Sequence, residues 1–228
     1  MNANKSMAYT DLVQKRKACH ECGNCLNNPT DEESGRFDSE QIGPWSVWQG
    51  NLNARLLVIG QDWGDVNYFS KQKGQSKDDS PSNATIQRLL DSIGIKIPPP
   101  SLRSAELGEI FMTNAILCLK QGGKDGGVRK EWFDKCGKFF LKPLITIIQP
   151  KVVVTLGRYA FRLICDLYNL HPPKYRDTIL CPVELRLTGN ITYIPVYHVS
   201  PLVLMKTRKI GEQEGDWQRI RTALDKSA

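Results

Sequence analysis

Four short apolar runs, separated by stretches of helical character, constrain the fold of this chain most strongly. The runs are LLVIG at 56–60, the segment 109–118 that ends in TNAILC, KVVVTLG at 151–157 and ITYIPVY at 191–197. Continuous apolar runs of this length are typical of strands buried on both faces of a sheet. Helices are expected at 83–95, 131–149, 158–168 and about 213–226. This alternation predicts an α/β fold, a three-layer α/β/α sandwich with a mainly parallel central sheet.

Local signals refine this prediction. A short basic helix is expected at 8–18, and residues 65–82 are polar and rich in Ser, Lys and Asp, which favours a loop. Ser82 or Asn83 suits the N-cap of the helix that follows this loop. Pro143 is expected to kink the helix at 131–149, because proline removes a backbone donor.

Length and charge limit the classes of function. The chain has 228 residues, enough for a sizeable core, and we expect one domain over 1–228 with an N-terminal cysteine-bearing segment at about 8–50. The net charge of +7 and the pI of about 9.0 suit a polyanionic partner, although an ordinary basic surface has the same composition. No apolar run is long enough for a membrane span or a signal peptide. We therefore expect a cytoplasmic monomer without membrane association.

Polar side chains follow three of the apolar runs directly. Asp62 comes after the first run, Asn114 lies in the second, and His198 follows the last. Because ligands of open α/β sheets bind beyond the carboxyl ends of the strands, these three side chains are expected to meet in one crevice. A carboxylate, an amide and an imidazole there can recognise a small polar group and cut a bond beside it. Asn114 could instead cap a turn, and a single His is often structural.

The seven cysteines need an explanation, because disulfides are rare in the cytosol. Cys19 and Cys22 form a CxxC pair, and Cys22 forms a second one with Cys25. CxxC presents two thiolates to one metal centre, although CxxC alone indicates zinc or chance as readily as a cluster. Cys118 and Cys136 are further candidate ligands. Of the rest, Cys165 lies on an apolar helix and is expected to be buried, and Cys181 carries no partner signal.

In combination, these segments resemble the uracil-DNA glycosylase superfamily, and specifically its iron–sulfur branch. The resemblance rests on GQDWG at 60–64, TNAILC at 113–118, QPKVVVTLG at 149–157 and HVSPL at 198–202, and it spans roughly residues 15–220. It implies a DNA-repair enzyme that flips uracil out of DNA, hydrolyses its N-glycosidic bond and leaves an abasic site. It also implies a 4Fe–4S cluster held by Cys19, Cys22, Cys118 and Cys136, with Cys25 as the alternative to Cys19.

The resemblance also implies roles in catalysis. Asp62 would position the attacking water and stabilise charge, while Asn114 would read the uracil edge with its amide. His198 would stabilise negative charge at uracil O2, where the backbone N–H groups of Gln61 and Asp62 would also bind. The first motif departs from the iron–sulfur pattern, since GQD opens the motif of the cluster-free enzymes and Trp63 stands in place of a proline. Asp65 is the weaker alternative for the carboxylate.

Further implied roles concern the base and the DNA. Phe69, or else Tyr68, would stack on the flipped base. Around HVSPL, the resemblance places Ser200 beside a minor-groove wedge formed by Pro201 and Leu202, and it implies phosphate contacts from the residues that follow, Lys206, Arg208 and Lys209. An ordinary turn and a solvated charged segment are the competing interpretations.

Three other functions stay open at this point. The altered first motif could favour another deaminated base, such as hypoxanthine or xanthine. The same fold could belong to a non-catalytic iron–sulfur protein that binds nucleic acid, because folds host unrelated functions. A zinc-stabilised regulatory module is a more distant possibility.

Overall fold

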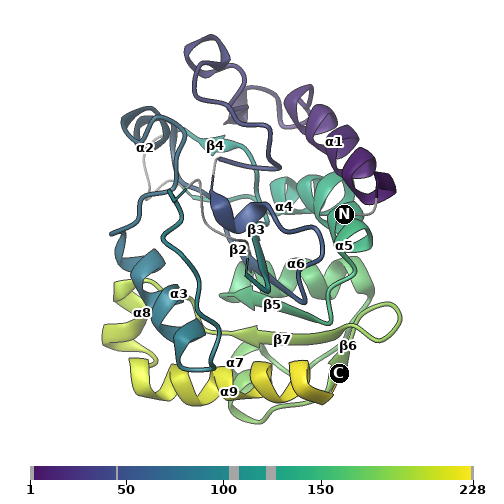
Figure 1. Ribbon diagram of the computed structural model, residues 1–228, viewed down its shortest axis with the longest axis vertical. Helices are drawn as coiled ribbons and strands as arrows, with labels where there is room; N and C mark the ends of the chain where they lie inside the picture. The colour runs from purple at the N-terminus through teal and green to yellow at the C-terminus, as the bar shows by residue number, and fades with distance from the viewer. Residues whose placement is uncertain (1–2, 45, 103–107, 122–126, 227–228) are drawn as a thin grey trace.

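The computed structural model describes residues 3–44, 46–102, 108–121 and 127–226. Its central sheet contains five strands in the order β3-β2-β5-β7-β6 (Figure 1). Their bounds are β2 Leu56–Gly60, β3 Ile110–Asn114, β5 Val152–Leu156, β6 Leu185–Arg186 and β7 Thr192–Val196. The four longer strands run parallel, and only the short β6 is antiparallel to its neighbour. A separate ribbon pairs β1 (Leu26–Asn27) with β4 (Leu119–Lys120).

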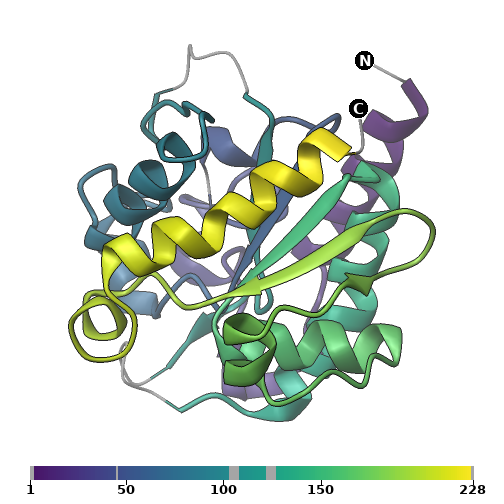
Figure 2. The same cartoon turned by 90° about the horizontal axis from the view of Figure 1, so that it is seen from below.

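Helices cover both faces of the sheet, as the alternating pattern predicts. The helices α3 and α9 lie on one face, and α1, α4, α5 and α6 lie on the other (Figures 1 and 2). Their bounds are α1 Ala3–Lys17, α3 Pro81–Asp91, α4 Lys130–Cys136, α5 Lys142–Ile148, α6 Arg158–Tyr168 and α9 Ile210–Lys226. Three shorter helices are α2 Val66–Lys71, α7 Tyr175–Leu180 and α8 Pro201–Lys206. The three-layer α/β/α architecture is therefore confirmed.

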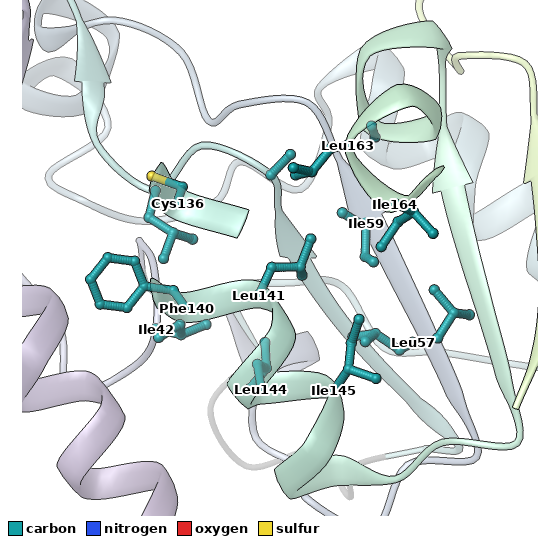
Figure 3. Close-up of a cluster of buried hydrophobic side chains, with 14 of the residues drawn as sticks. Ile42, Leu57, Ile59, Cys136, Phe140, Leu141, Leu144, Ile145, Leu163 and Ile164 are labelled. Atoms are coloured by element: carbon teal, nitrogen blue, oxygen red, sulfur yellow. The ribbon is translucent and has the colours of Figure 1, made fainter. Parts of the chain in front are cut away.

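The apolar run of β2 is buried on both faces because its side chains alternate between two cores. Leu57 and Ile59 pack against α5 and α6, where Ile145 and Ile164 meet them (Figure 3). The intervening Leu56 and Val58 pack on the opposite face with residues of α3 and α9. Because its side chains are buried on both faces, β2 is held firmly at the centre of the sheet. The position of the residues that directly follow β2 is therefore well defined.

Three local predictions differ from the structure. The expected loop at 65–82 contains α2, because Asp65 caps that helix by accepting a hydrogen bond from the Tyr68 N–H at 2.9 Å. The next helix begins at Pro81 with Ser80 as its N-cap, two or three residues earlier than Ser82 or Asn83. Proline at the first helical position favours this start, since it has no N–H to satisfy.

The expected kink at Pro143 takes the form of a change in helix type. A π-helical stretch, Gly137–Leu141, separates α4 from α5, and Pro143 lies in the first turn of α5. Because Pro143 donates no hydrogen bond, the preceding turn widens without losing a bond at that position. The widened turn still contributes Phe140 and Leu141 to the core (Figure 3).

The N-terminal cysteine-bearing segment packs against the main core. Leu12 of α1, Leu26 of β1 and Ile42 belong to the same buried cluster as the sheet residues. The Arg16 side chain is 1% exposed and donates to Asp38 and to two backbone carbonyls. Within the described ranges, no helix has the length and apolar character needed to cross a membrane.

Candidate active site

The predicted crevice lies where the strand order reverses. From β2 the chain crosses to β3 on one side and then returns to β5 on the other, so helices leave on opposite faces at this point. Ligands of open α/β sheets bind at such switch points. A pocket of about 340 Å³ opens there, and Gln61, Asp62, Asn114 and His198 all line it. The structure therefore brings together the polar residues that follow three different strands.

Asp62 is held by two neighbours at the wall of this pocket. Its Oδ1 lies 3.2 Å from the Lys120 ammonium, and its Oδ2 accepts a hydrogen bond of 2.7 Å from the Gln61 side-chain amide. The side chains of Lys120 and Asp62 are only 5% and 8% exposed. Each carboxylate oxygen has two lone-pair sites, so Asp62 can still accept a hydrogen bond from a water molecule. Lys120, which the sequence analysis missed, was visible only as a single cation in the apolar run ILCLK.

Asn114 ends β3 directly opposite Gly60, the last residue of β2. A Cβ atom at residue 60 would lie 2.3 Å from the Asn114 Oδ1, so only glycine allows this approach. Among the described residues, the Asn114 amide has no hydrogen-bond partner. Asn114 lines the pocket, so an amide without a partner, which carries both a donor and an acceptor, is available there.

His198 follows β7 and presents one nitrogen to the pocket. Its Nδ1 accepts a hydrogen bond of 3.1 Å from the Ser200 backbone N–H, so the ring proton of the neutral form is on Nε2. Burial lowers the pKa of His198 below its ordinary value, and the Asp62 carboxylate opposes this shift only in part. Gly157 lies against the ring, where a Cβ would be 3.3 Å from the His198 Cβ. The residue is a neutral hydrogen-bond donor at pH 7.

The aromatic residues after the first motif are not arranged as expected. Phe69 is fully buried and does not line the pocket, whereas Trp63 and Tyr68 do. The centroids of the Trp63 and Tyr68 rings lie 5.0 Å apart, and the Phe69 ring meets Trp63 edge-on at 5.7 Å. The sequence alone could not separate these neighbours, because α2 decides which of them points outward. Asp65 is occupied as the cap of α2, which makes it less suited than Asp62 to hold a water.

The segment after His198 forms a projecting helix, α8, with its N-cap at Ser200. Pro201 begins this helix, and Leu202 is 62% exposed, as a wedge would require. Arg208 differs from the expectation, because it forms a two-pronged ion pair with Asp216 at 2.8 and 3.0 Å. It also contacts Glu212 at 2.8 Å. Arg208 thus has protein carboxylates as partners where a phosphate contact was expected, while Lys206 and Lys209 are exposed.

Four cysteines line one small cavity at the other end of the β4 ribbon. They are Cys19, Cys22, Cys118 and Cys136. Burial, together with repulsion from the neighbouring thiolates, raises the pKa of Cys118 far above its usual value and that of Cys136 to about 12. A bound cation would remove both penalties, so this donor set fits a thiolate-ligated metal group. Nevertheless, the described ranges contain no group of three or more His, Cys, Asp or Glu arranged to hold a metal ion.

The other cysteines have different surroundings. Cys25 is absent from the lining of this cavity, and the Arg129 Nη1 donates to its sulfur at 3.6 Å. Cys165 is buried on α6 as expected, and Cys181 is exposed at the end of α7. A larger hollow of about 1200 Å³ lies at the opposite edge of the sheet, beside Arg186 and Arg219. None of the expected site residues lines that hollow, so the smaller pocket at the switch point is the better candidate site.

Comparisons with known proteins identify the family of this chain. Residues 47–221 match the Uracil DNA glycosylase superfamily, which covers the sheet, the switch-point pocket and α8. The chain is also 22% identical over 169 residues to a Type-4 uracil-DNA glycosylase of Archaeoglobus fulgidus, a match that covers 71% of this chain and 78% of the relative. Because the family match includes more than half of the chain, this protein belongs to the Uracil DNA glycosylase superfamily.

Proposed function

We propose that this protein is a uracil-DNA glycosylase that hydrolyses the N-glycosidic bond of deoxyuridine and leaves an abasic site. The observation that carries the proposal is the convergence of Asp62, Asn114 and His198 on one pocket. A base inside a duplex cannot reach such a pocket, so the nucleotide must first rotate out of the stack. Leu202 at the start of α8 would fill the gap that the base leaves, and its exposure supports this role.

Recognition of the base falls to Asn114. Its NH₂ group donates to uracil O4, and its carbonyl oxygen accepts from uracil N3–H. Cytosine has an amino group and an unprotonated N3 at the same edge. The amino group would face the Asn114 NH₂ group, donor against donor, and N3 would face the Asn114 carbonyl oxygen, acceptor against acceptor. A site that leaves buried polar groups unpaired rejects the wrong ligand strongly. Trp63 and Tyr68, which line the pocket, would stack on the base in place of Phe69.

Bond cleavage is divided between His198 and Asp62. When the C1′–N1 bond breaks, its electron pair leaves with uracil, and the negative charge spreads to O2. The Nε2–H of neutral His198 donates to that oxygen, and the buried setting strengthens this interaction. The sugar becomes positively charged, and the Asp62 carboxylate stabilises it. A water held by Asp62 attacks C1′ and passes a proton to the Asp62 carboxylate. Asp62 returns this proton to solvent and the uracil anion takes one up, so the products are free uracil and an abasic sugar.

The cysteine cavity supports a proposed 4Fe–4S cluster with Cys19, Cys22, Cys118 and Cys136 as ligands. Four cysteine thiolates are the usual ligands of a 4Fe–4S cluster, and these four cysteines line one cavity. When bound, the cluster would supply a structural tie between the N-terminal segment and β4. Iron and sulfide analysis tests this assignment: Cys118→Ser is expected to lose both, whereas Cys25→Ser and the exposed Cys181→Ser should retain them.

A second candidate substrate is hypoxanthine. Its O6 and N1–H present the same acceptor and donor pattern as uracil O4 and N3–H, so Asn114 would pair with either base. The pocket extends past the site of base recognition to Ser76, Ser82 and Asn83, which leaves space for a purine ring. Relative single-turnover rates on matched oligonucleotides separate the two substrates, and a faster rate on hypoxanthine would replace uracil as the main substrate.

The decisive experiment compares Asp62→Asn with a matched control. Cleavage of a labelled uracil-containing oligonucleotide, followed by alkali, reports the abasic product under single-turnover conditions. We expect Asp62→Asn to lower the rate by roughly 10²–10⁴-fold, the usual contribution of a general base. Asp65→Asn is the control, because asparagine caps α2 as well as aspartate does. Wild-type protein that yields no abasic product from uracil or any other deaminated base would favour the non-catalytic alternative.

A further inference from the structure

We propose that Lys120 is the positioning residue of this site, and that it acts on the reaction only through Asp62. This inference rests on the proposed function, because it concerns the carboxylate assigned to the water and the sugar. Lysine is almost never fully buried unless it is paired. Here the side chain is 5% exposed and its ammonium lies 3.2 Å from the Asp62 Oδ1.

The geometry places Lys120 behind Asp62 as seen from the pocket. Asp62 lines the pocket, while Lys120 is not among the lining residues. The ammonium holds one carboxylate oxygen and the Gln61 amide holds the other, so the carboxylate plane is fixed from two sides. A carboxylate removed from water needs such a cation to remain charged at low cost. Lys120 therefore sets the direction of the carboxylate that is proposed to face the sugar.

The backbone of Lys120 is anchored to two other segments. Its N–H donates to the Gly64 carbonyl at 3.1 Å, inside the first motif, and the residue pairs with Leu26 in the β1–β4 ribbon. Leu26 directly follows the cysteine-bearing turn, and Cys118 lies two positions before Lys120. The ribbon thus connects the cysteine cavity to the loop of the first motif, GQDWG at 60–64. Lys120 contacts this loop and also pairs with the strand that follows the cysteines.

A double-mutant cycle tests this role. The variants are Lys120→Met, Asp62→Asn and the combination, with Lys120→Arg as the conservative replacement. If Lys120 works by placing Asp62, its removal should lower kcat about 100-fold, the effect of an error of about 1 Å in a reacting group, with little change in KM. In the Asp62→Asn background, Lys120→Met should change kcat by no more than about twofold, because the carboxylate that Lys120 positions is already absent. Lys120→Arg should recover most of the lost kcat.

Folding is controlled within the same set. Removing one charge of a buried pair is destabilising, whereas removing both is often neutral, so the double variant should regain the thermal stability that Lys120→Met loses. Lys130→Met removes two exposed ion pairs, with Asp134 and Asp166, and should leave kcat unchanged.

Wild-type turnover is measured first, and a wild type without glycosylase activity refutes the proposed function together with this inference. With an active wild type, two results overturn the role of Lys120 alone. One is an unchanged kcat in Lys120→Met. The other is an equal loss in both backgrounds, which would mean that Lys120 contacts the substrate directly.

Discussion

The approach of Gly60 to Asn114 gives the sharpest test of the site. Gly60 has an ordinary strand conformation, so alanine fits its backbone, but the added Cβ would lie 2.3 Å from the Asn114 Oδ1. Ordinary van der Waals contact of a Cβ begins at 3.4 Å. The amide must therefore move by about 1 Å, the difference between these distances. Gly60→Ala moves the amide that is proposed to read the base, without changing Asn114 itself.

The expected magnitude follows from that displacement. An error of about 1 Å in a positioning group costs about 100-fold in rate, equivalent to about 2.7 kcal/mol. Stability should change little, because the described structure gives the Asn114 amide no hydrogen bond to lose, and a shifted rotamer costs roughly 0.5–1.5 kcal/mol. Gly60→Ala is therefore expected to separate activity from folding.

The assay is single-turnover cleavage of a uracil-containing duplex, with thermal unfolding measured on the same samples. Gly215→Ala is the matched control, since a Cβ at this position in α9 meets nothing within 4 Å. It should leave the rate unchanged and stabilise the protein by roughly 0.5–1 kcal/mol. A Gly60→Ala protein that keeps the wild-type rate would refute the reasoning. Both Gly60→Ala and Asn114→Ala are expected to remove the same contact. A double variant whose cleavage rate falls by the product of the two single effects would therefore also refute the reasoning.

Three further predictions concern His198, Leu202 and Arg208. Because burial lowers the pKa of His198 below 6.5, the wild type should lose stability relative to His198→Gln as the pH falls below 6.5, and hold a constant difference above it; urea unfolding across pH checks the sign. Leu202→Ala should keep the wild-type Tm, because this side chain is 62% exposed, yet cleave uracil in duplex DNA about tenfold more slowly. Single-stranded substrate, which needs no wedge, is its control. Arg208→Ala should destabilise the protein by roughly 1–3 kcal/mol, because Asp216 loses its partner. The Arg208→Ala protein should bind DNA with the same salt dependence as the wild type. If the slope of log K against log salt concentration were instead smaller by about one, Arg208 would contact a phosphate.

The parts of this molecule that could be predicted are those in which a local pattern dictates a position. The apolar run LLVIG became β2 with its expected bounds, and RYAFRLICDLY became α6. Once these strands were parallel, Asp62, Asn114 and His198 had to meet, because the carboxyl ends of parallel strands share one edge. The site followed from topology more than from any single motif.

The parts that could not be predicted depend on which side chain a local turn points outward. Phe69 and Tyr68 are neighbouring aromatic residues, and only the start of α2 at Val66 directs one inward and the other toward the pocket. Lys120 was missed because a lone lysine carries no signal of burial, and its partner is distant in sequence. Arg208 looked available for phosphate since the carboxylate of Asp216 lies one helix further along the chain.

The switch-point pocket also has a consequence for the way the chain folds. Its lining runs from residue 46 to residue 199, so a fragment that lacks part of this range cannot contain the complete candidate site. Pairings this distant in sequence form late and slowly, because loop closure must precede the contacts that reward it. On the ribosome, nascent chains should remain inactive until β7 has emerged and inserted beside β5. Recovery of uracil excision after dilution from denaturant would therefore report the final assembly of the sheet, later than any signal from helix content alone.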